Sequence, residues 1–283
     1  MSTFIDSIFD KDRLEATAIL SPSIRKKPEL IVEGYLDMRI LTSSCQYFRR
    51  SVNFTYPSKD SGKKGVIDDF RSRKGETNLW ALVDTDHEFE TKHESPKLMN
   101  TTPWVTLASS IYYGKRKEEN HIRSIVSKIL METKLSNVKH SDYVKIRDIS
   151  RGLNIAKLYS GYSRKAGRYH ELNWFEVTSS KSDDRIEGML NIIFPVKEDR
   201  LKLIQFRERH AIFLSKCGIN DHRIEEAISL FLKSKGVSVS KKELENYTKK
   251  TILEDIKASR SPPILPFTLS EVMIELSRKQ YQK

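Results

Sequence analysis

Short apolar runs punctuate the first hundred residues of the chain. Runs rich in β-branched and aromatic residues predict strands at Glu29–Val32, Val52–Tyr56, Leu79–Val83 and Trp104–Ala108. The run Leu79–Val83 holds five consecutive apolar residues. A continuous apolar run of this kind is typical of a strand that is covered by helices on both faces.

Helical spacing lies between these runs. Tyr35–Phe48 places Leu36, Ile40 and Leu41 on one face, and Val66–Arg71 predicts a shorter helix. Strands that alternate with helices predict an α/β fold with a doubly wound parallel sheet. We expect this unit to occupy residues 1–115.

The remainder, residues 116–283, is predicted to be mainly helical. The segment Arg223–Lys235 has a single apolar face, and Gly236 is suited to end it. Ser240 and Glu243 have the spacing of a capping box, which predicts the start of another helix. Ser261–Pro263 breaks that helix system, and Ser270–Lys279 is predicted to form the final helix.

Composition indicates a charged chain with a cationic surface. The 283 residues are 38% hydrophobic and carry a formal net charge of +12, which favours phosphate-rich partners. Cys45 and Cys217 form neither a disulfide framework nor a zinc ligand set. Without a predicted signal peptide or an apolar run of membrane-spanning length, we expect a cytoplasmic protein with no membrane partner.

Positive charge and tyrosine concentrate in residues 111–170. This segment has 14 Lys and Arg against five Asp and Glu, and six of the 11 tyrosines. Cations bind phosphates and aromatic rings stack on unpaired bases, so the segment is a candidate nucleic-acid surface. Arg164, Lys165 and Arg168 lie in its most contact-like stretch, a predicted loop. Solvated helix faces with tyrosines along their edges are the alternative.

The first candidate site follows the first predicted strand. Glu33 would leave this strand at its carboxyl end, and Gly34 permits a sharp turn there. Asp37 lies one helical turn later, so its carboxylate can face the same side as that of Glu33. The alternative is that both are surface carboxylates favoured by a helix N-terminus.

The second candidate site follows the strongest predicted strand. Asp84 and Asp86 alternate around Thr85, so their carboxylates point roughly the same way. Glu88 could join them or face solvent. The same Asp-x-Asp pattern occurs in phosphatases with an aspartyl nucleophile, which would make Asp84 the nucleophile and give Glu33 and Asp37 no necessary role.

The two acidic motifs are more informative together than apart. Strand ends on the same side of a parallel sheet form one crevice, where ligands bind. Several carboxylates in one crevice repel each other unless a cation lies between them, and hard oxygen ligands suit Mg²⁺. On a basic protein, a magnesium site indicates phosphodiester chemistry.

The order of these motifs resembles the Toprim domain. Its pattern is strand, Glu-Gly-x-x-Asp and helix, then a second βα unit and a strand that ends in Asp-x-Asp. The resemblance covers residues 28–115, and Ile31–Leu41 is most similar to the nuclease branch related to the overcoming-lysogenization-defect (OLD) proteins. Toprim domains also occur in primases, topoisomerases and recombination proteins.

The chain as a whole resembles the AriB-type effector nucleases of the PARIS anti-phage defence system. This resemblance implies a toxic nuclease that an ATPase partner (AriA-like) sequesters until a phage trigger releases it. It also implies that the active form is a homodimer that cleaves RNA, namely tRNA. Composition and spacing do not show any of these properties.

The Toprim resemblance also implies roles for individual residues. Glu33, Asp84 and Asp86 would hold one Mg²⁺ or Mn²⁺, and Asp37 would share it or hold a second ion. Lys115 would act in catalysis by steadying the charge on the phosphate, and Lys115 and Arg116 would bind nucleic acid. One further acidic ligand is expected, supplied by Glu88, Glu118 or Glu119.

A second hypothesis remains open beside the nuclease. A Toprim-like scaffold could serve as a non-catalytic module that holds nucleic acid or a partner on its basic half. Binding of divalent cations would distinguish the two functions, because only the nuclease requires it.

Overall fold

The computed structural model describes most of the chain between Lys27 and Ala258. The described residues are 27–44, 52–57, 62–86, 95–101, 104–133, 138–179 and 182–258. Glu88, the neighbouring His87 and the predicted helix Ser270–Lys279 lie outside them.

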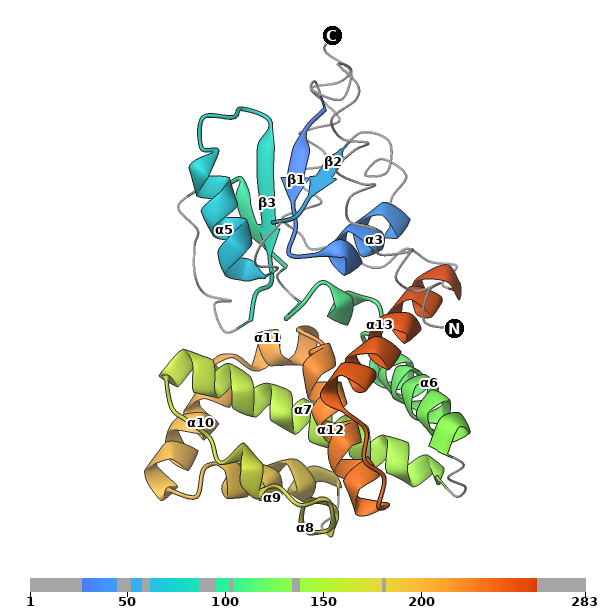
Figure 1. The fold of residues 1–283 in the computed structure, drawn as a ribbon. Helices are drawn as coiled ribbons and strands as arrows, with labels where there is room; N and C mark the ends of the chain where they lie inside the picture. Colours follow the sequence, from blue (N-terminus) through green and yellow to red (C-terminus); the bar gives the residue numbers. More distant parts are fainter. Residues whose placement is uncertain are drawn as a thin grey trace.

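Four parallel strands form the sheet, in the order β2-β1-β3-β4 (Figure 1). They are β1 (Glu29–Ile31), β2 (Asn53–Thr55), β3 (Leu79–Val83) and β4 (Leu98–Asn100). β1 pairs with both β2 and β3, and β4 pairs with β3 at the edge. All carboxyl ends therefore lie at one edge of the sheet, as the alternating pattern predicted.

The two faces of the sheet belong to two different hydrophobic clusters. Leu30, Trp80 and Leu82 face the larger cluster, whereas Ile31 and Ala81 face the smaller one. Side chains alternate along a strand, so a strand buried on both faces must be apolar at every position. This explains why all five residues of β3 are buried.

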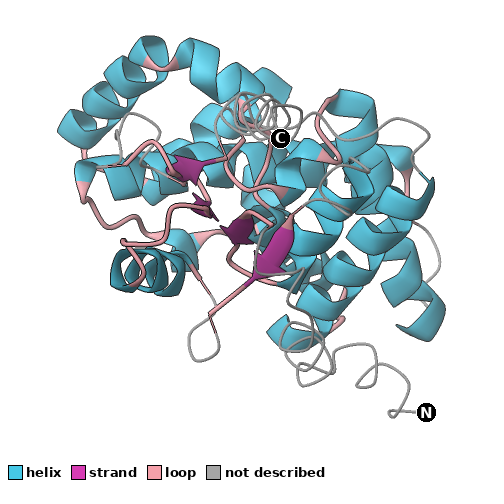
Figure 2. Ribbon diagram, turned by 90° about the horizontal axis from the view of Figure 1, so that it is seen from above, coloured by secondary structure: helices cyan, strands magenta, loops and turns pink. Residues whose placement is uncertain are grey.

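In the described part of the chain, two helices lie between the first three strands. The helix α3 (Tyr35–Ser44) follows β1, and α5 (Lys63–Ser72) follows β2 and packs on β3 through the smaller cluster. Seen from above, helices lie on both sides of the strands (Figure 2). The fold class is therefore α/β with a parallel sheet, as predicted.

The rest of the described chain is helical (Figure 1). The long helices α6 and α7 are followed by shorter helices and then by α12 and α13. Their bounds are η3 (Ala108–Ser110), α6 (Lys115–Thr133), α7 (His140–Ser163), η4 (Tyr169–Glu171), α8 (Trp174–Thr178), α9 (Ser182–Ile193), α10 (Lys197–Arg209), α11 (Ala211–Lys216), α12 (Asp221–Ser234) and α13 (Lys241–Ala258). Within the described ranges, no helix is sufficiently long and apolar to cross a membrane.

The helix ends in the C-terminal half confirm the predictions. Gly236 follows α12 with a φ of 74°, a backbone conformation that suits glycine. Before α13, the Ser240 N–H donates to Glu243 Oε2 at 2.8 Å, and the Glu243 N–H donates to Ser240 Oγ at 3.2 Å. This reciprocal pair is the predicted capping box.

The predicted strand Trp104–Ala108 is wrong. This segment is irregular up to the short η3 helix, and the fourth strand is Leu98–Asn100 instead. Trp104 and Val105 are buried because the segment packs beneath the strand ends, where the Val105 N–H donates to the Cys217 carbonyl at 2.9 Å. A buried irregular segment needs apolar residues just as a buried strand does, so the sequence pattern does not distinguish the two.

The larger hydrophobic cluster is continuous between the sheet and the helices. It extends from Leu30 in β1 to Ile252 in α13 and includes buried residues of α6, α7 and α12. The helix α13 packs against both α6 and α3. One face of the sheet therefore depends on the helical half for its burial.

Candidate metal centre at the strand ends

Glu33 lies directly beyond the end of β1. The Val32 N–H still donates to the Thr55 carbonyl of β2, and the chain leaves the sheet at the next residue. Oε1 of Glu33 accepts the backbone N–H of Asp84 at 2.7 Å, so the carboxylate reaches across to the end of β3. This hydrogen bond joins the two acidic motifs, which lie 51 residues apart in the sequence.

Asp37 lies in the first turn of α3. Its Oδ2 accepts the backbone N–H of Gly34 at 3.1 Å, which caps the start of the helix. Its carboxylate also lies close enough to Glu33 for the two charges to interact. Asp37 therefore combines the role expected of a helix N-terminus with a place in the acidic crevice.

Asp84 and Asp86 follow β3, as predicted. Oδ1 of Asp84 accepts the backbone N–H of Leu107 at 3.2 Å. Asp86 has a φ of 45°, a left-handed conformation that Asp tolerates better than most residues, and its N–H donates to the Val105 carbonyl at 3.3 Å. Backbone groups of Val105 and Leu107, in the segment that follows β4, thus hold both aspartates in place.

One cation, Lys63, reaches this group from the start of α5. Its Nζ donates to the carbonyl oxygen of Asp84 at 3.0 Å, and its charge stabilises the ionised form of Glu33. The backbone of Lys63 also hydrogen-bonds the Glu33 carboxylate. Lys63 thereby ties the N-terminus of α5 to the ends of β1 and β3.

Burial and mutual repulsion raise the proton affinity of these carboxylates. Burial raises the pKa of Asp37 to about 7, with further contributions from the charges of Glu33 and Asp221. Burial also raises the pKa of Asp84 well above its usual value, followed by the charges of Glu33, Asp37 and Asp86. The pKa of Glu33 is raised mainly by burial, although the Asp84 N–H opposes this.

This donor set fits a hard divalent cation. The charges of Glu33, Asp37, Asp84 and Asp86 act on one another at the ends of β1 and β3. Burial and this repulsion raise the pKa of Glu33, Asp37 and Asp84, because little positive charge compensates their ionised forms. A bound cation reverses that balance, since it stabilises the ionised forms. Mg²⁺ and Mn²⁺ both accept such oxygen ligands.

A fifth carboxylate, Asp221, comes from the helical half. It is the first residue of α12, and its charge raises the pKa of both Asp37 and Asp84. Asp221, His222 and Glu225 also form a group whose potential ligand atoms lie within 4.8 Å of one another. His222 Nδ1 is 3.0 Å from Glu225 Oε2, and this contact raises the pKa of His222.

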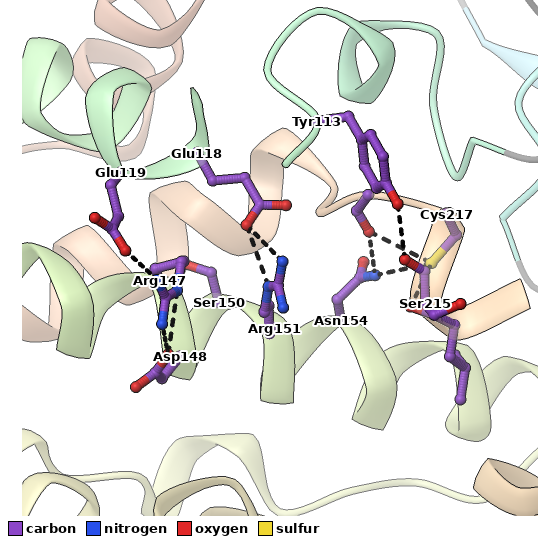
Figure 3. A network of polar contacts seen from close by, with 12 residues as sticks. Tyr113, Glu118, Glu119, Arg147, Asp148, Ser150, Arg151, Asn154, Ser215 and Cys217 are labelled. Carbon is purple, nitrogen blue, oxygen red and sulfur yellow. Dashed lines mark hydrogen bonds and ion pairs between the residues drawn. The ribbon is translucent and has the colours of Figure 1, made fainter. Parts of the chain in front are cut away.

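The structure places Glu118 and Glu119 in a different network (Figure 3). Glu118 Oε2 accepts from Arg151 Nη2 at 2.9 Å, and Glu119 pairs with Arg147. Both arginines belong to α7. The expectation that one of these glutamates completes the metal site finds no support in their contacts, because each is paired with an arginine of α7.

Beyond Glu119, the network continues into the helical core. Arg147 also donates to Asp148 Oδ1 at 2.7 Å, and Arg185 of α9 donates to Asp148 Oδ2 at 2.6 Å. All three side chains are at least nine-tenths buried. The network therefore joins α6, α7 and α9.

The predicted nucleic-acid contacts whose side chains the structure describes lie at the surface. Arg116 is exposed in the first turn of α6, and Lys115 opens that helix, although its side chain is outside the described part. Arg164 adopts a left-handed conformation at the end of α7. Lys165 pairs with Asp199 at 3.3 Å and Arg168 with Glu171 at 3.4 Å, each pair at the surface.

Half of the tyrosines in the basic segment are unavailable for stacking on bases. Tyr112, Tyr143 and Tyr159 are each less than 9% exposed and belong to the hydrophobic core. Tyr162 is 40% exposed and packs against the ring of the buried Phe206. Half of the tyrosines of the predicted nucleic-acid surface therefore belong to the core, whereas Arg116 and Arg164 are exposed.

In comparisons with known proteins, no family model matches the chain and no curated protein is significantly similar to it. The Toprim resemblance therefore depends on the motifs and on the parallel sheet that carries them.

Sequence reasoning missed two members of the site. Lys63 precedes Lys64 and Gly65 in a segment that lacks a phosphate-loop pattern, so the sequence offered no reason to place it at the strand ends. Asp221 is more than a hundred residues from the nearest acidic motif. An acidic residue at a helix N-terminus is common, and only tertiary structure shows where this helix begins.

Proposed function

We propose that the chain is a metal-dependent nuclease of the Toprim type, with Glu33, Asp37, Asp84 and Asp86 as ligands of Mg²⁺ or Mn²⁺. The observation that carries this proposal is the convergence of these carboxylates at the ends of the adjacent parallel strands β1 and β3. Two ions are proposed, with Asp37 shared or holding the second.

Backbone hydrogen bonds orient the carboxylates of the proposed site before a cation binds. The Asp84 N–H fixes Glu33, and the Leu107 N–H fixes Asp84, so both carboxylates keep their orientation without a ligand. A bound divalent cation would supply a Lewis acid to a phosphodiester oxygen and lower the pKa of a water molecule that acts as nucleophile. Positioning of this kind avoids reorganisation during the reaction.

RNA, and specifically tRNA, is the proposed substrate. The net charge of +12 and the exposed Arg116 and Arg164 favour a polyanion. The proposed biological role is that of a toxic effector in anti-phage defence, active as a homodimer after release from an AriA-like ATPase partner. These parts of the proposal come from the sequence resemblance.

Cleavage of labelled tRNA by the purified full-length protein tests the nuclease. Glu33→Gln keeps an oxygen that can accept the Asp84 N–H but removes the charge. Because loss of outer-shell partners already costs about 10–100-fold in metal affinity or activity, we expect loss of a direct ligand to lower the rate about a hundredfold or more. Asp68→Asn, an exposed position on α5, is the matched control and should cleave normally.

Cleavage by Glu33→Gln at the wild-type rate would refute the nuclease. Two further measurements separate the nuclease from the non-catalytic module and RNA from DNA as the substrate. One is a titration of the protein with Mn²⁺, and the other is a cleavage assay with a labelled DNA duplex. Nucleic-acid binding without cation binding and without cleavage of either substrate would favour the non-catalytic module. Cleavage of DNA alone would correct the substrate and leave the chemistry in place.

A further inference from the structure

Thr101 is the first residue after β4, and it lies directly beside the end of β3. Its backbone N–H donates to the Val83 carbonyl at 3.0 Å, so this hydrogen bond joins the ends of the two strands. Val83 is the last residue of β3 and precedes Asp84 in the chain. Thr101 is only 1% exposed, so its hydroxyl needs partners within the protein.

The Thr101 hydroxyl uses its full hydrogen-bonding capacity. It donates to the Trp104 carbonyl at 3.0 Å, since a carbonyl oxygen can only accept. Its oxygen accepts the Thr85 N–H at 3.0 Å and lies 3.1 Å from the Thr85 hydroxyl, which must therefore supply the proton of that contact. A hydroxyl has one donor and two acceptor sites, so all three are occupied.

Thr85, the partner of this hydroxyl, is the central residue of the second acidic motif. It is fully buried and follows the end of β3 by two residues. A buried backbone N–H that loses its acceptor destabilises the folded state. Beyond the end of β3, the Thr101 side chain supplies that acceptor, and the backbone conformation between Asp84 and Asp86 therefore depends on it.

The segment that accepts the Thr101 hydroxyl also holds the two aspartates of the motif. The Leu107 N–H donates to the Asp84 carboxylate at 3.2 Å, and the Val105 carbonyl accepts the Asp86 N–H at 3.3 Å. The Thr101 hydroxyl donates to this segment and accepts from the residue between the two aspartates. It therefore connects the motif to the backbone groups that hold it on either side.

The conformation of the motif requires support of this kind. Asp86 has a φ of 45°, a left-handed conformation that is unfavourable for residues with a Cβ. Loss of the acceptor for the Thr85 N–H would let this turn relax and would move the aspartates on either side. In metal sites, hydrogen bonds behind the ligands orient them and thereby raise the affinity for the ion.

We propose that Thr101 is a positioning residue of the cation site at the strand ends. Its hydroxyl holds the turn between Asp84 and Asp86, and thereby sets the positions of both carboxylates before a cation binds. The inference rests on the proposed metal site, and it adds a residue that belongs to neither acidic motif.

Mn²⁺ binding by the full-length protein, measured from the electron paramagnetic resonance signal of free Mn²⁺, provides a test without activity. Thr101→Val keeps the shape of the side chain but removes the hydroxyl, and it should lower the Mn²⁺ affinity about 10–100-fold. Thr101→Ser restores the hydroxyl and should recover most of that affinity. Thr248→Val is the matched control, because its hydroxyl is equally buried but lies in α13, where it donates to the Leu244 carbonyl at 3.0 Å. This control should bind Mn²⁺ as the wild type does.

Unfolding temperatures separate positioning from a purely structural role. Both valine variants should lower the metal-free Tm, because each removes a buried hydrogen bond. A fixed excess of Mn²⁺ should raise the Tm of Thr248→Val as much as that of the wild type, but should raise the Tm of Thr101→Val less. An equal rise in both variants, or an affinity that Thr101→Ser does not recover, overturns the proposal.

If Thr101→Val does not fold, Thr85→Val takes its place. This variant removes the hydroxyl that donates to Thr101 and keeps the backbone N–H that donates to the same oxygen. It should lower the Mn²⁺ affinity about tenfold, at the smaller end of the same range. Wild-type affinity in Thr85→Val would then overturn the proposal.

The two proposals fail in different ways. Wild-type Mn²⁺ affinity in Thr101→Val, with binding lost in Glu33→Gln, overturns the role of Thr101 and leaves the strand-end site intact. Absence of Mn²⁺ binding to the wild-type protein overturns both.

Discussion

The Asp37 carboxylate should destabilise the metal-free protein at neutral pH. Its pKa rises from 3.8 to about 7 in the folded state, because of burial and the charges of Glu33 and Asp221. Between these values the folded protein keeps a proton that the unfolded chain has lost. The free energy of unfolding therefore falls as the pH rises from about 4 to about 7.

The substitution Asp37→Asn removes this cost. Each pKa unit corresponds to about 1.4 kcal/mol, so the full shift amounts to at most about 4 kcal/mol at pH 8. Partial exposure and coupling to Glu33 reduce that figure, and we expect a gain of about 2 kcal/mol. The amide oxygen of Asn can still accept the Gly34 N–H that caps α3.

Urea unfolding at pH 4 and pH 8, with a chelator present, measures the effect. The variant should match the wild type at pH 4 and exceed it at pH 8, whereas the control Asp68→Asn should change stability by less than about 0.5 kcal/mol at both. Saturating Mn²⁺ should then stabilise the wild type more than Asp37→Asn. A variant that is less stable than the wild type at pH 8, or a gap that is equal at both pH values, would refute the reasoning.

Two further substitutions test other charged contacts. Asp148→Asn leaves the two buried arginines of α7 and α9 without their shared anion, so urea unfolding should show a loss of about 3–5 kcal/mol. The control Glu198→Gln removes only an exposed ion pair and should leave the unfolding midpoint unchanged. Lys63→Met removes the cation among the carboxylates and should cost the metal-free protein about 1–3 kcal/mol. Saturating Mn²⁺ should restore most of the lost stability, and the control Lys64→Met should leave stability unchanged. A loss that Mn²⁺ does not restore would argue that Lys63 does not compensate the charge of the carboxylates.

Local pattern predicted the central part of the fold well. The strand Leu79–Val83 has the predicted bounds because burial on both faces forces every position to be apolar. The capping box of Ser240 and Glu243 was equally predictable, since both partners lie within one turn. The strand at Leu98–Asn100 was missed because three residues at a sheet edge give no period to detect.

The candidate site likewise contains residues that the sequence predicted and residues that it did not. Sequence alone predicted that Glu33 and Asp84 approach each other, because both follow strands and parallel strands share an edge. The position of Asp221 depends on how α12 packs beneath that edge, which involves the Ser109 and Ile219 contact across 110 residues. No local signal encodes a contact of that range.

The continuous hydrophobic cluster also sets an order of events during synthesis. The ribosome delivers β1 well before the buried residues of α12 and Ile252 of α13, which share a cluster with Leu30. The sheet cannot cover its second face until then. A chain that stops before Ile252 would therefore lack part of the core that covers this face of the sheet. The stability of the sheet should therefore appear only after the last helices of this cluster have been synthesised and packed.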